Sequence, residues 1–164
     1  MISIGILSDT HLTACTPEFQ ADACRAFSGC EMIIHAGDLT DTSILEAFAG
    51  KIVHAVQGNT CNFMTRQNLP MEKTLTLEGN IIGICHGAGP RASIEERVWN
   101  LFPHADCIIF GHTHEPLCTR RGKTLFINPG SFRSTGPFGS PATYAILTVA
   151  PEGLQAKIFS LSQS

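Results

Sequence analysis

Five apolar segments of this sequence each end in side chains that bind metal ions. The first, residues 2–7, leads into Ser8-Asp9-Thr10-His11. The pattern recurs at Gly37-Asp38, Gly58-Asn59, Cys85-His86-Gly87 and Gly111-His112-Thr113-His114. In α/β sheets, ligands bind beyond the carboxyl ends of the strands. We therefore expect these segments to be strands whose ends meet.

The Asp9-Thr10-His11 sequence places a carboxylate and an imidazole two residues apart. Both side chains would lie on the same side if the extended conformation continued through Thr10. Such a pair is frequent by chance, and it gains weight only because similar clusters follow downstream.

The strand ends together offer more oxygen and nitrogen donors than one tetrahedral zinc ion needs. They suit two divalent ions, and the absence of thiolates favours Mn, with Fe, Zn or Ni as alternatives. A carboxylate should bridge them, since it offers two anionic oxygens. His35, His54 and His104 lie within or before strands and are left out. The predicted ligands are Asp9, His11, Asp38, Asn59, His86, His112 and His114.

The first half of the chain alternates apolar segments with helical patterns. Thr16-Pro17-Glu18 predicts a helix start, with the helix ending at Gly29. Asp41 or Thr42 should cap a second helix that ends at Gly50. With strands at residues 2–8, 32–36 and 52–56, this order indicates a parallel sheet covered on both faces.

The second half changes character. Gly79-Asn80 should form the turn of a β-hairpin between residues 72–77 and 81–85. Ser93-Ile94-Glu95-Glu96 resembles a capping box that starts a helix running to Phe102. A buried strand follows at 107–110. Antiparallel strands are then predicted at 117–118, 124–127, 142–149 and 154–159, with a long loop over 128–141 that suggests function or mobility.

Composition narrows the class of protein. A chain of 164 residues with 43% hydrophobic and 15% charged residues predicts one globular domain, 1–164. The net charge of −3 and the lack of a basic stripe argue against a nucleic-acid footprint, and Arg120-Arg121-Gly122-Lys123 is expected at a hairpin tip. Seven cysteines without a CxxC pair favour free thiols in a reducing cytoplasm. We see neither a signal peptide nor a membrane span.

The ordered blocks D-x-H, G-D, G-N, a later H and G-H-x-H resemble the calcineurin-like metallophosphoesterase superfamily. With Asn128-Pro129-Gly130-Ser131, the chain is similar to the small single-domain phosphodiesterase branch. The resemblance spans roughly residues 2–160. It implies an α/β fold: a two-sheet β-sandwich flanked by helices, in four αββα layers.

The resemblance also implies roles for individual residues. One metal would take Asp9, His11, Asp38 and His114, and the other Asp38, Asn59, His86 and His112. Asp38 would be the bridge, and a metal-bridging hydroxide would attack phosphorus in line. Asn128, Ser131 and Arg133 are candidates for shaping the substrate side, and a turn beside the site is the equal alternative.

The chain departs from many relatives after Gly58-Asn59. Those relatives carry a His or Cys and then an acidic residue, and the His can act as general acid. Here Thr60-Cys61-Asn62 follows, so leaving groups of low pKa should be favoured.

The sequence is compatible with three functions. The first is hydrolysis of a small phosphodiester, or of a monoester, by a cytoplasmic enzyme that could form a homo-oligomer. The second is a metal-binding protein-interaction scaffold without activity, as in the retromer subunit of this superfamily. The third, a nuclease, is disfavoured by the net acidity.

Overall fold

Two five-stranded sheets form the centre of the molecule, as a computed structural model describes it over residues 1–133 and 141–161. The first sheet has the strand order β10-β9-β1-β2-β3. Within it β1, β2 and β3 are parallel, and β9 runs antiparallel to both β1 and β10. Its strands are β1 (Ile2–Leu7), β2 (Met32–His35), β3 (Ile52–Ala55), β9 (Thr143–Ala150) and β10 (Gly153–Ser160).

The second sheet has the order β4-β5-β6-β8-β7. Its three inner strands, β5, β6 and β8, are parallel, and the outer strands β4 and β7 are antiparallel to their neighbours. Of the strands predicted to be antiparallel, β7 pairs in that direction with β8 and β9 with β10, whereas β8 also pairs with β6 in parallel. The β7–β8 hairpin reverses the chain once more, which returns β8 to the direction of β6. The strands are β4 (Glu72–Leu77), β5 (Asn80–Cys85), β6 (Cys107–Ile109), β7 (Leu117–Arg121) and β8 (Thr124–Asn128).

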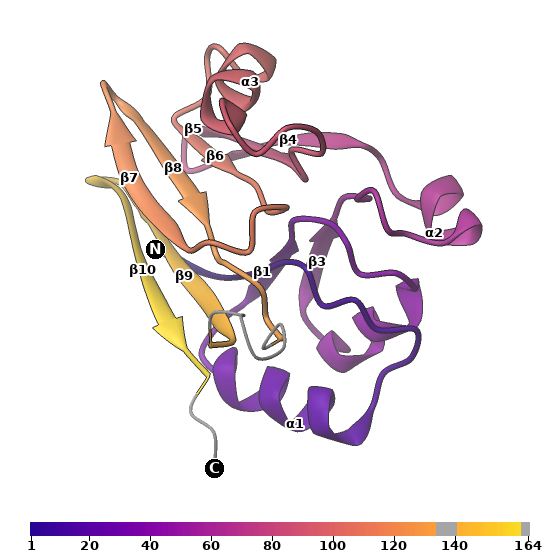
Figure 1. The fold of residues 1–164 in the computed structure, drawn as a ribbon. Coiled ribbons are helices and arrows are strands. Elements are labelled where there is room, and N and C mark those ends of the chain that lie inside the picture. The colour runs from indigo at the N-terminus through magenta and orange to yellow at the C-terminus, as the bar shows by residue number, and fades with distance from the viewer. Residues whose placement is uncertain (134–140, 162–164) are drawn as a thin grey trace.

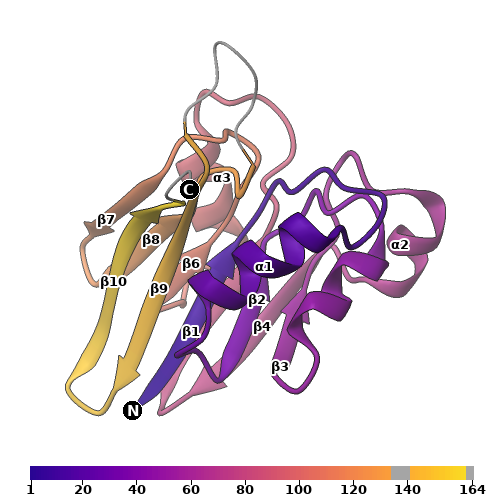
Figure 2. The ribbon, with the colours of Figure 1, turned by 90° about the horizontal axis from the view of Figure 1, so that it is seen from below.

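Helices cover the outer faces of both sheets (Figures 1 and 2). On the first sheet, α1 (Pro17–Ala26) and the 3₁₀ helix η1 (Thr42–Phe48) pack their aromatic side chains against Ile33. On the second, α3 (Ile94–Leu101) packs against Ile108 and Phe126. The expected four-layer αββα sandwich is thus confirmed. The parallel strands β1, β2 and β3 are covered by helices on one face and by the second sheet on the other.

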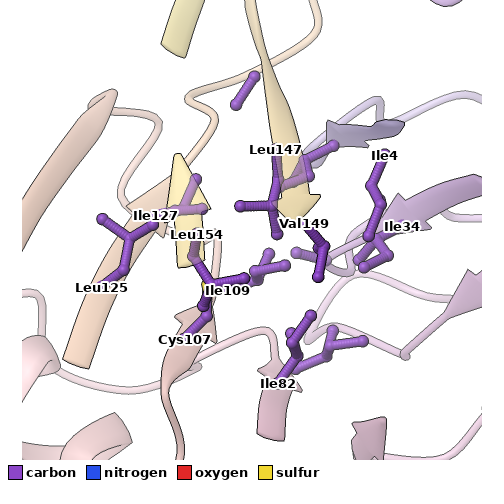
Figure 3. Packing of buried hydrophobic residues seen from close by; sticks show 14 of the residues in the cluster. Ile4, Ile34, Ile82, Cys107, Ile109, Leu125, Ile127, Leu147, Val149 and Leu154 are labelled. Carbon is purple, nitrogen blue, oxygen red and sulfur yellow. The ribbon is translucent and has the colours of Figure 1, made fainter. Parts of the chain in front are cut away.

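Branched aliphatic side chains from both sheets fill the space between them (Figure 3). Ile4 and Ile34 of the first sheet face Ile82, Ile109 and Ile127 of the second, and all five are fully buried. Burying a side chain of this size contributes roughly 1.5–3 kcal/mol. This core holds the strand ends in fixed positions relative to one another.

Several local predictions hold. Thr16 caps α1 by accepting a hydrogen bond from the Phe19 N–H, and Pro17 begins the helix. Asp41 caps the second predicted helix, which is 3₁₀. Gly122 lies in the turn of the β7–β8 hairpin, so the basic cluster is at a hairpin tip as expected.

Three local features differ from the predictions. The β4–β5 turn is Glu78-Gly79, both with positive φ, one residue earlier than expected. Ser93 precedes α3 in a left-handed conformation and makes no side-chain cap, so the capping box is wrong. The short helix α2 (Phe63–Asn68), capped by Asn62, was not foreseen because only Cys61 and Leu69 beside it bury apolar surface.

Two further expectations concern the chain as a whole. All seven cysteines are free thiols. Among the described residues, no helix is long and apolar enough to cross a bilayer. The predicted loop over 128–141 lies partly outside the described residues, which stop at Arg133 and resume at Pro141.

Candidate metal centre

The predicted ligands lie in five loops that follow parallel strands. Asp9 and His11 follow β1, and Asp38 follows β2. Asn59 comes after β3 and His86 directly after β5. His112 and His114 follow β6. The two sheets therefore contribute donors from both sides of the sandwich to one place.

Donors from four of these loops form two overlapping groups. In the first, Asp9 Oδ1 lies 3.1 Å from His114 Nε2 and 3.8 Å from His11 Nε2. In the second, His86 Nε2 lies 3.1 Å from Asp38 Oδ2 and 3.9 Å from Asp9 Oδ1. Within each group the donor atoms are all within 4.8 Å of one another. Asp38 Oδ2 is also 4.0 Å from His11 Nε2, so both carboxylates contact both groups.

Asn59 and His112 lie beside the second group. Asn59 Oδ1 is 3.1 Å from His112 Nδ1, and the His112 and His86 rings pack edge to face with centroids 5.3 Å apart. All seven predicted ligands are therefore neighbours, with Asn59 and His112 at the edge of the cluster.

The backbone at the site is in an uncommon conformation. Five of the seven predicted ligands have positive φ: Asp9 (54°), His11 (49°), Asp38 (55°), His112 (71°) and His114 (62°). The extended conformation therefore does not continue through Thr10, although the two side chains do converge. Aspartate and histidine tolerate this region better than most residues. Such strain clusters at functional sites.

Hydrogen bonds between adjacent loops hold these conformations. The Asp9 N–H donates to the Gly37 carbonyl and the His11 N–H to the Asp38 carbonyl, both at 3.0 Å. Gly37 has a φ of 93°, and a Cβ there would lie 2.6 Å from the His86 ring. Only glycine therefore fits between the β2 and β5 loops.

Two hydroxyl residues that sequence reasoning did not assign orient the carboxylates. Ser8 Oγ donates to Asp9 Oδ2 at 2.6 Å. The Thr60 N–H donates to Asp38 Oδ1 at 2.8 Å, and its hydroxyl lies 3.2 Å from His11 Nδ1. Both residues directly adjoin predicted ligands, which is the signal that could have indicated them. Their bonds leave Asp9 Oδ1 and Asp38 Oδ2 directed at the imidazoles.

Backbone carbonyls fix the imidazoles in a similar way. His86 Nδ1 lies 2.9 Å from the Ala36 carbonyl, and His112 Nε2 lies 2.8 Å from the Gly89 carbonyl. A carbonyl can only accept, so these nitrogens carry the protons. In the neutral rings, the form that binds metal ions, this leaves His86 Nε2 and His112 Nδ1 with lone pairs.

Arg97 on α3 supports this arrangement, and nothing in its sequence context indicated it. Its guanidinium donates to the carbonyls of Gly87 (2.8 Å) and Pro90 (2.5 Å). These contacts hold the loop that supplies the Gly89 carbonyl to His112.

The charges of the site depend on one another. Burial opposes ionisation of Asp38, but the neighbouring His86 and the Thr60 N–H outweigh it and lower its pKa to about 2. Burial likewise opposes ionisation of Asp9, yet His114, His86 and Ser8 lower its pKa. Burial disfavours the charged form of His86, but the two carboxylates raise its pKa above the usual value. The carboxylates therefore remain anionic and attract cations.

The donor set fits divalent metal ions. Asp9 Oδ1 and His86 Nε2 are buried and have no hydrogen-bond partner within residues 1–133 and 141–161, despite their nearby neighbours. Unpaired buried polar atoms are costly, and a bound cation would satisfy both. Mixed carboxylate, amide and imidazole donors without thiolate suit Mn, Fe, Zn or Ni.

The three candidates for the substrate side contact the ligand loops. Asn128 is buried, and its side-chain amide donates to the Gly111 carbonyl. Ser131 Oγ, also buried, donates to the Asp9 carbonyl. Arg133 is exposed and reaches the His11 carbonyl at 3.4 Å. For Asn128 and Ser131 these contacts support the loops from below, and a role toward substrate stays a prediction.

His35 lies under the site without joining it. It is fully buried, its Nε2 is 3.1 Å from Thr10 Oγ1, and burial lowers its pKa to about 3. Because the unfolded chain binds this proton near pH 6.5, the folded state should lose stability as pH falls from 6.5 toward 3. At about 1.4 kcal/mol per pH unit, the loss at pH 5 is about 2 kcal/mol.

Denaturant unfolding of wild type and His35→Gln, both with chelator, measures this loss. The variant should show a shallower decline between pH 7 and 4. Parallel declines would mean that His35 is not the group that titrates.

Comparison with known proteins identifies the family of this chain. Residues 2–152 match the family model of the calcineurin-like phosphoesterase superfamily domain. A "Probable metallophosphoesterase" of Methanothermobacter thermautotrophicus is 34% identical over 158 residues, covering 94% of this chain and 90% of that protein.

Solved structures share the fold. A structure described as a novel archaeal phosphodiesterase superposes with a TM-score of 0.74 at 22% identity, covering 96% of this chain and all of that one. Vps29 of Entamoeba histolytica, complexed with Zn²⁺, gives a TM-score of 0.72 at 20% identity and covers 98% of this chain and all of that one. With the family model matching most of its length, the chain belongs to the calcineurin-like phosphoesterase superfamily.

Proposed function

We propose that this protein hydrolyses a small phosphodiester with two divalent metal ions, Mn being preferred. The observation that carries the proposal is the pair of donor groups that share Asp9, with Asp38 Oδ2 of one group also 4.0 Å from His11 Nε2 of the other. As at the sequence level, we assign Asp9, His11, Asp38 and His114 to one ion. We assign Asp38, Asn59, His86 and His112 to the other.

The metal ions would polarise the phosphoryl oxygens and lower the pKa of water. The protein's own residues do the rest. Asp38, held ionised and oriented by Thr60, supplies negative charge between the two groups. The carbonyls of Ala36 and Gly89 keep the His86 and His112 rings in the orientation that directs lone pairs into the site.

The residues after Asn59 supply no general acid. Cys61 is buried and accepts from the Gly58 N–H. Asn62 is engaged by the Thr65 N–H and by Asp41. Thr60 has no acidic proton near neutral pH. Diesters with leaving groups of low pKa should therefore be the better substrates.

Hydrolysis of bis(p-nitrophenyl) phosphate by Mn²⁺-loaded protein tests the proposal. We expect release of p-nitrophenolate that excess chelator abolishes and added Mn²⁺ restores, and a lower rate on p-nitrophenyl phosphate. The control is free Mn²⁺ at the same concentration. No turnover above this control on any mono- or diester would contradict the proposal.

A protein-interaction scaffold is the second candidate. Phe63 and Met64 are adjacent on α2 and are 70% and 59% exposed. A partner protein that covered both would remove this apolar surface from water. Metal binding without turnover would favour this candidate.

A further inference from the structure

A cavity of about 780 Å³ adjoins the candidate metal centre. It lies between α2, the start of β4 and α3, and Asn59 and His86 form part of its wall. Ligand sites for small molecules typically enclose about 300–1,000 Å³. The cavity is therefore large enough for an organic group attached to a phosphate at the metal centre.

Apart from the metal-centre residues and the two arginines described next, the lining of this cavity is mainly apolar. Met71, Val98 and Leu101 contribute hydrocarbon and thioether surface. The buried Cys85 side chain also belongs to this lining.

The two arginines of the lining are engaged by the backbone. Arg66 donates to the carbonyls of Cys61 and Asn59. Arg97 donates to the carbonyls of Gly87 and Pro90. Glu72 adds a negative charge to the same lining. The cavity thus offers apolar contact rather than a second anion site.

We propose that this cavity binds a bulky apolar ester group of the substrate, at least one aromatic ring in size. The proposal rests on the proposed function, because the cavity adjoins the metal centre through Asn59 and His86. Met71 and Leu101 are 75% and 45% exposed, and an apolar ligand group would cover them.

Non-hydrolysable phosphonates with one organic group each test the size and polarity of this cavity. Methyl-, phenyl- and 2-naphthylphosphonate would compete with bis(p-nitrophenyl) phosphate for the Mn²⁺-loaded protein. We expect the inhibition constant to fall by about tenfold from methyl to phenyl and further to naphthyl, because each ring removes apolar surface from water.

Two variants of exposed lining residues locate the effect. Asn100→Trp should fill the cavity and bring the naphthyl constant close to the methyl constant. Leu101→Ser should reduce the ratio of the methyl to the naphthyl inhibition constant by about threefold or more. Asn68→Trp and Ile52→Ser, at exposed positions that do not line the cavity, are the matched controls and should keep the wild-type gradient.

The outcomes separate this proposal from the proposed function. If the protein turns over its substrate but all three phosphonates have the same inhibition constant, the apolar subsite is overturned and the proposed hydrolase function stands. The apolar lining would then be available for contact with a macromolecule. A gradient that persists in Asn100→Trp would also overturn it. Without turnover, calorimetric titration of the phosphonates into Mn²⁺-loaded protein reads the same gradient directly, and its presence would support the subsite.

Discussion

Replacing Asp38 with asparagine should remove both metal ions and lower turnover of an activated phosphodiester by about 100-fold or more. Asp38 Oδ2 lies between His86 Nε2 and His11 Nε2, at 3.1 and 4.0 Å. Its Oδ1 is held by the Thr60 N–H. Asparagine keeps the acceptor for Thr60 and loses only the charge, so the loop should keep its conformation.

Metal content by mass spectrometry and hydrolysis of bis(p-nitrophenyl) phosphate measure the effect. Asp41→Asn is the matched control. Asp41 lies three residues after Asp38, and its carboxylate caps η1. Asparagine caps equally well, and Asp41 belongs to neither donor group. This variant should bind both ions and retain activity.

Asp9→Asn distinguishes the two possible bridges. Asp9 Oδ1 is the donor atom common to both groups, yet Asp9 Oδ2 already accepts from Ser8 and from the His112 N–H. With Asp38 as the bridge, Asp9→Asn should retain one ion. Loss of both ions in Asp9→Asn, and of one in Asp38→Asn, would move the bridge to Asp9.

The convergence of the ligands was predictable because it depends on topology. Apolar strands followed by Asp9, Asp38 and His86 place these side chains at carboxyl ends, and parallel strands bring such ends to one edge. The sandwich itself came only through the family resemblance. Periodicity alone did not separate a second mixed sheet from a set of antiparallel strands, since the direction of β8 depends on which strand it joins.

The details of the site were less accessible. A left-handed φ at His112 results from contacts with distant loops, which a local pattern does not encode. Arg97 acts through backbone carbonyls of its neighbouring loop, and a lone arginine on a helix usually faces solvent. Thr60 appeared only as a missing general acid, whereas its N–H and hydroxyl contact Asp38 and His11.

Replacing Gly58 with alanine should disable the metal centre without touching a ligand. A Cβ at this position would lie 2.1 Å from Asp38 Oδ1 and 2.4 Å from the Asp38 nitrogen. Real contacts are longer than 3 Å, and part of what it meets is backbone, so the β2 loop must move. Displacing a reacting group by about 1 Å can cost 100-fold in rate. Overpacking costs about 1–3 kcal/mol of stability.

Gly29→Ala is the matched control, because nothing lies within 4 Å of its Cβ and neither glycine has a positive φ. The two variants therefore differ only in what the added methyl group meets. We expect Gly58→Ala to show reduced metal content, activity lowered by about 100-fold and a lower midpoint in urea, while Gly29→Ala stays close to wild type. Equal metal content and turnover in both variants would mean that Asp38 does not hold its position against Gly58 when the metal ions bind, and the geometry on which the centre depends would be wrong.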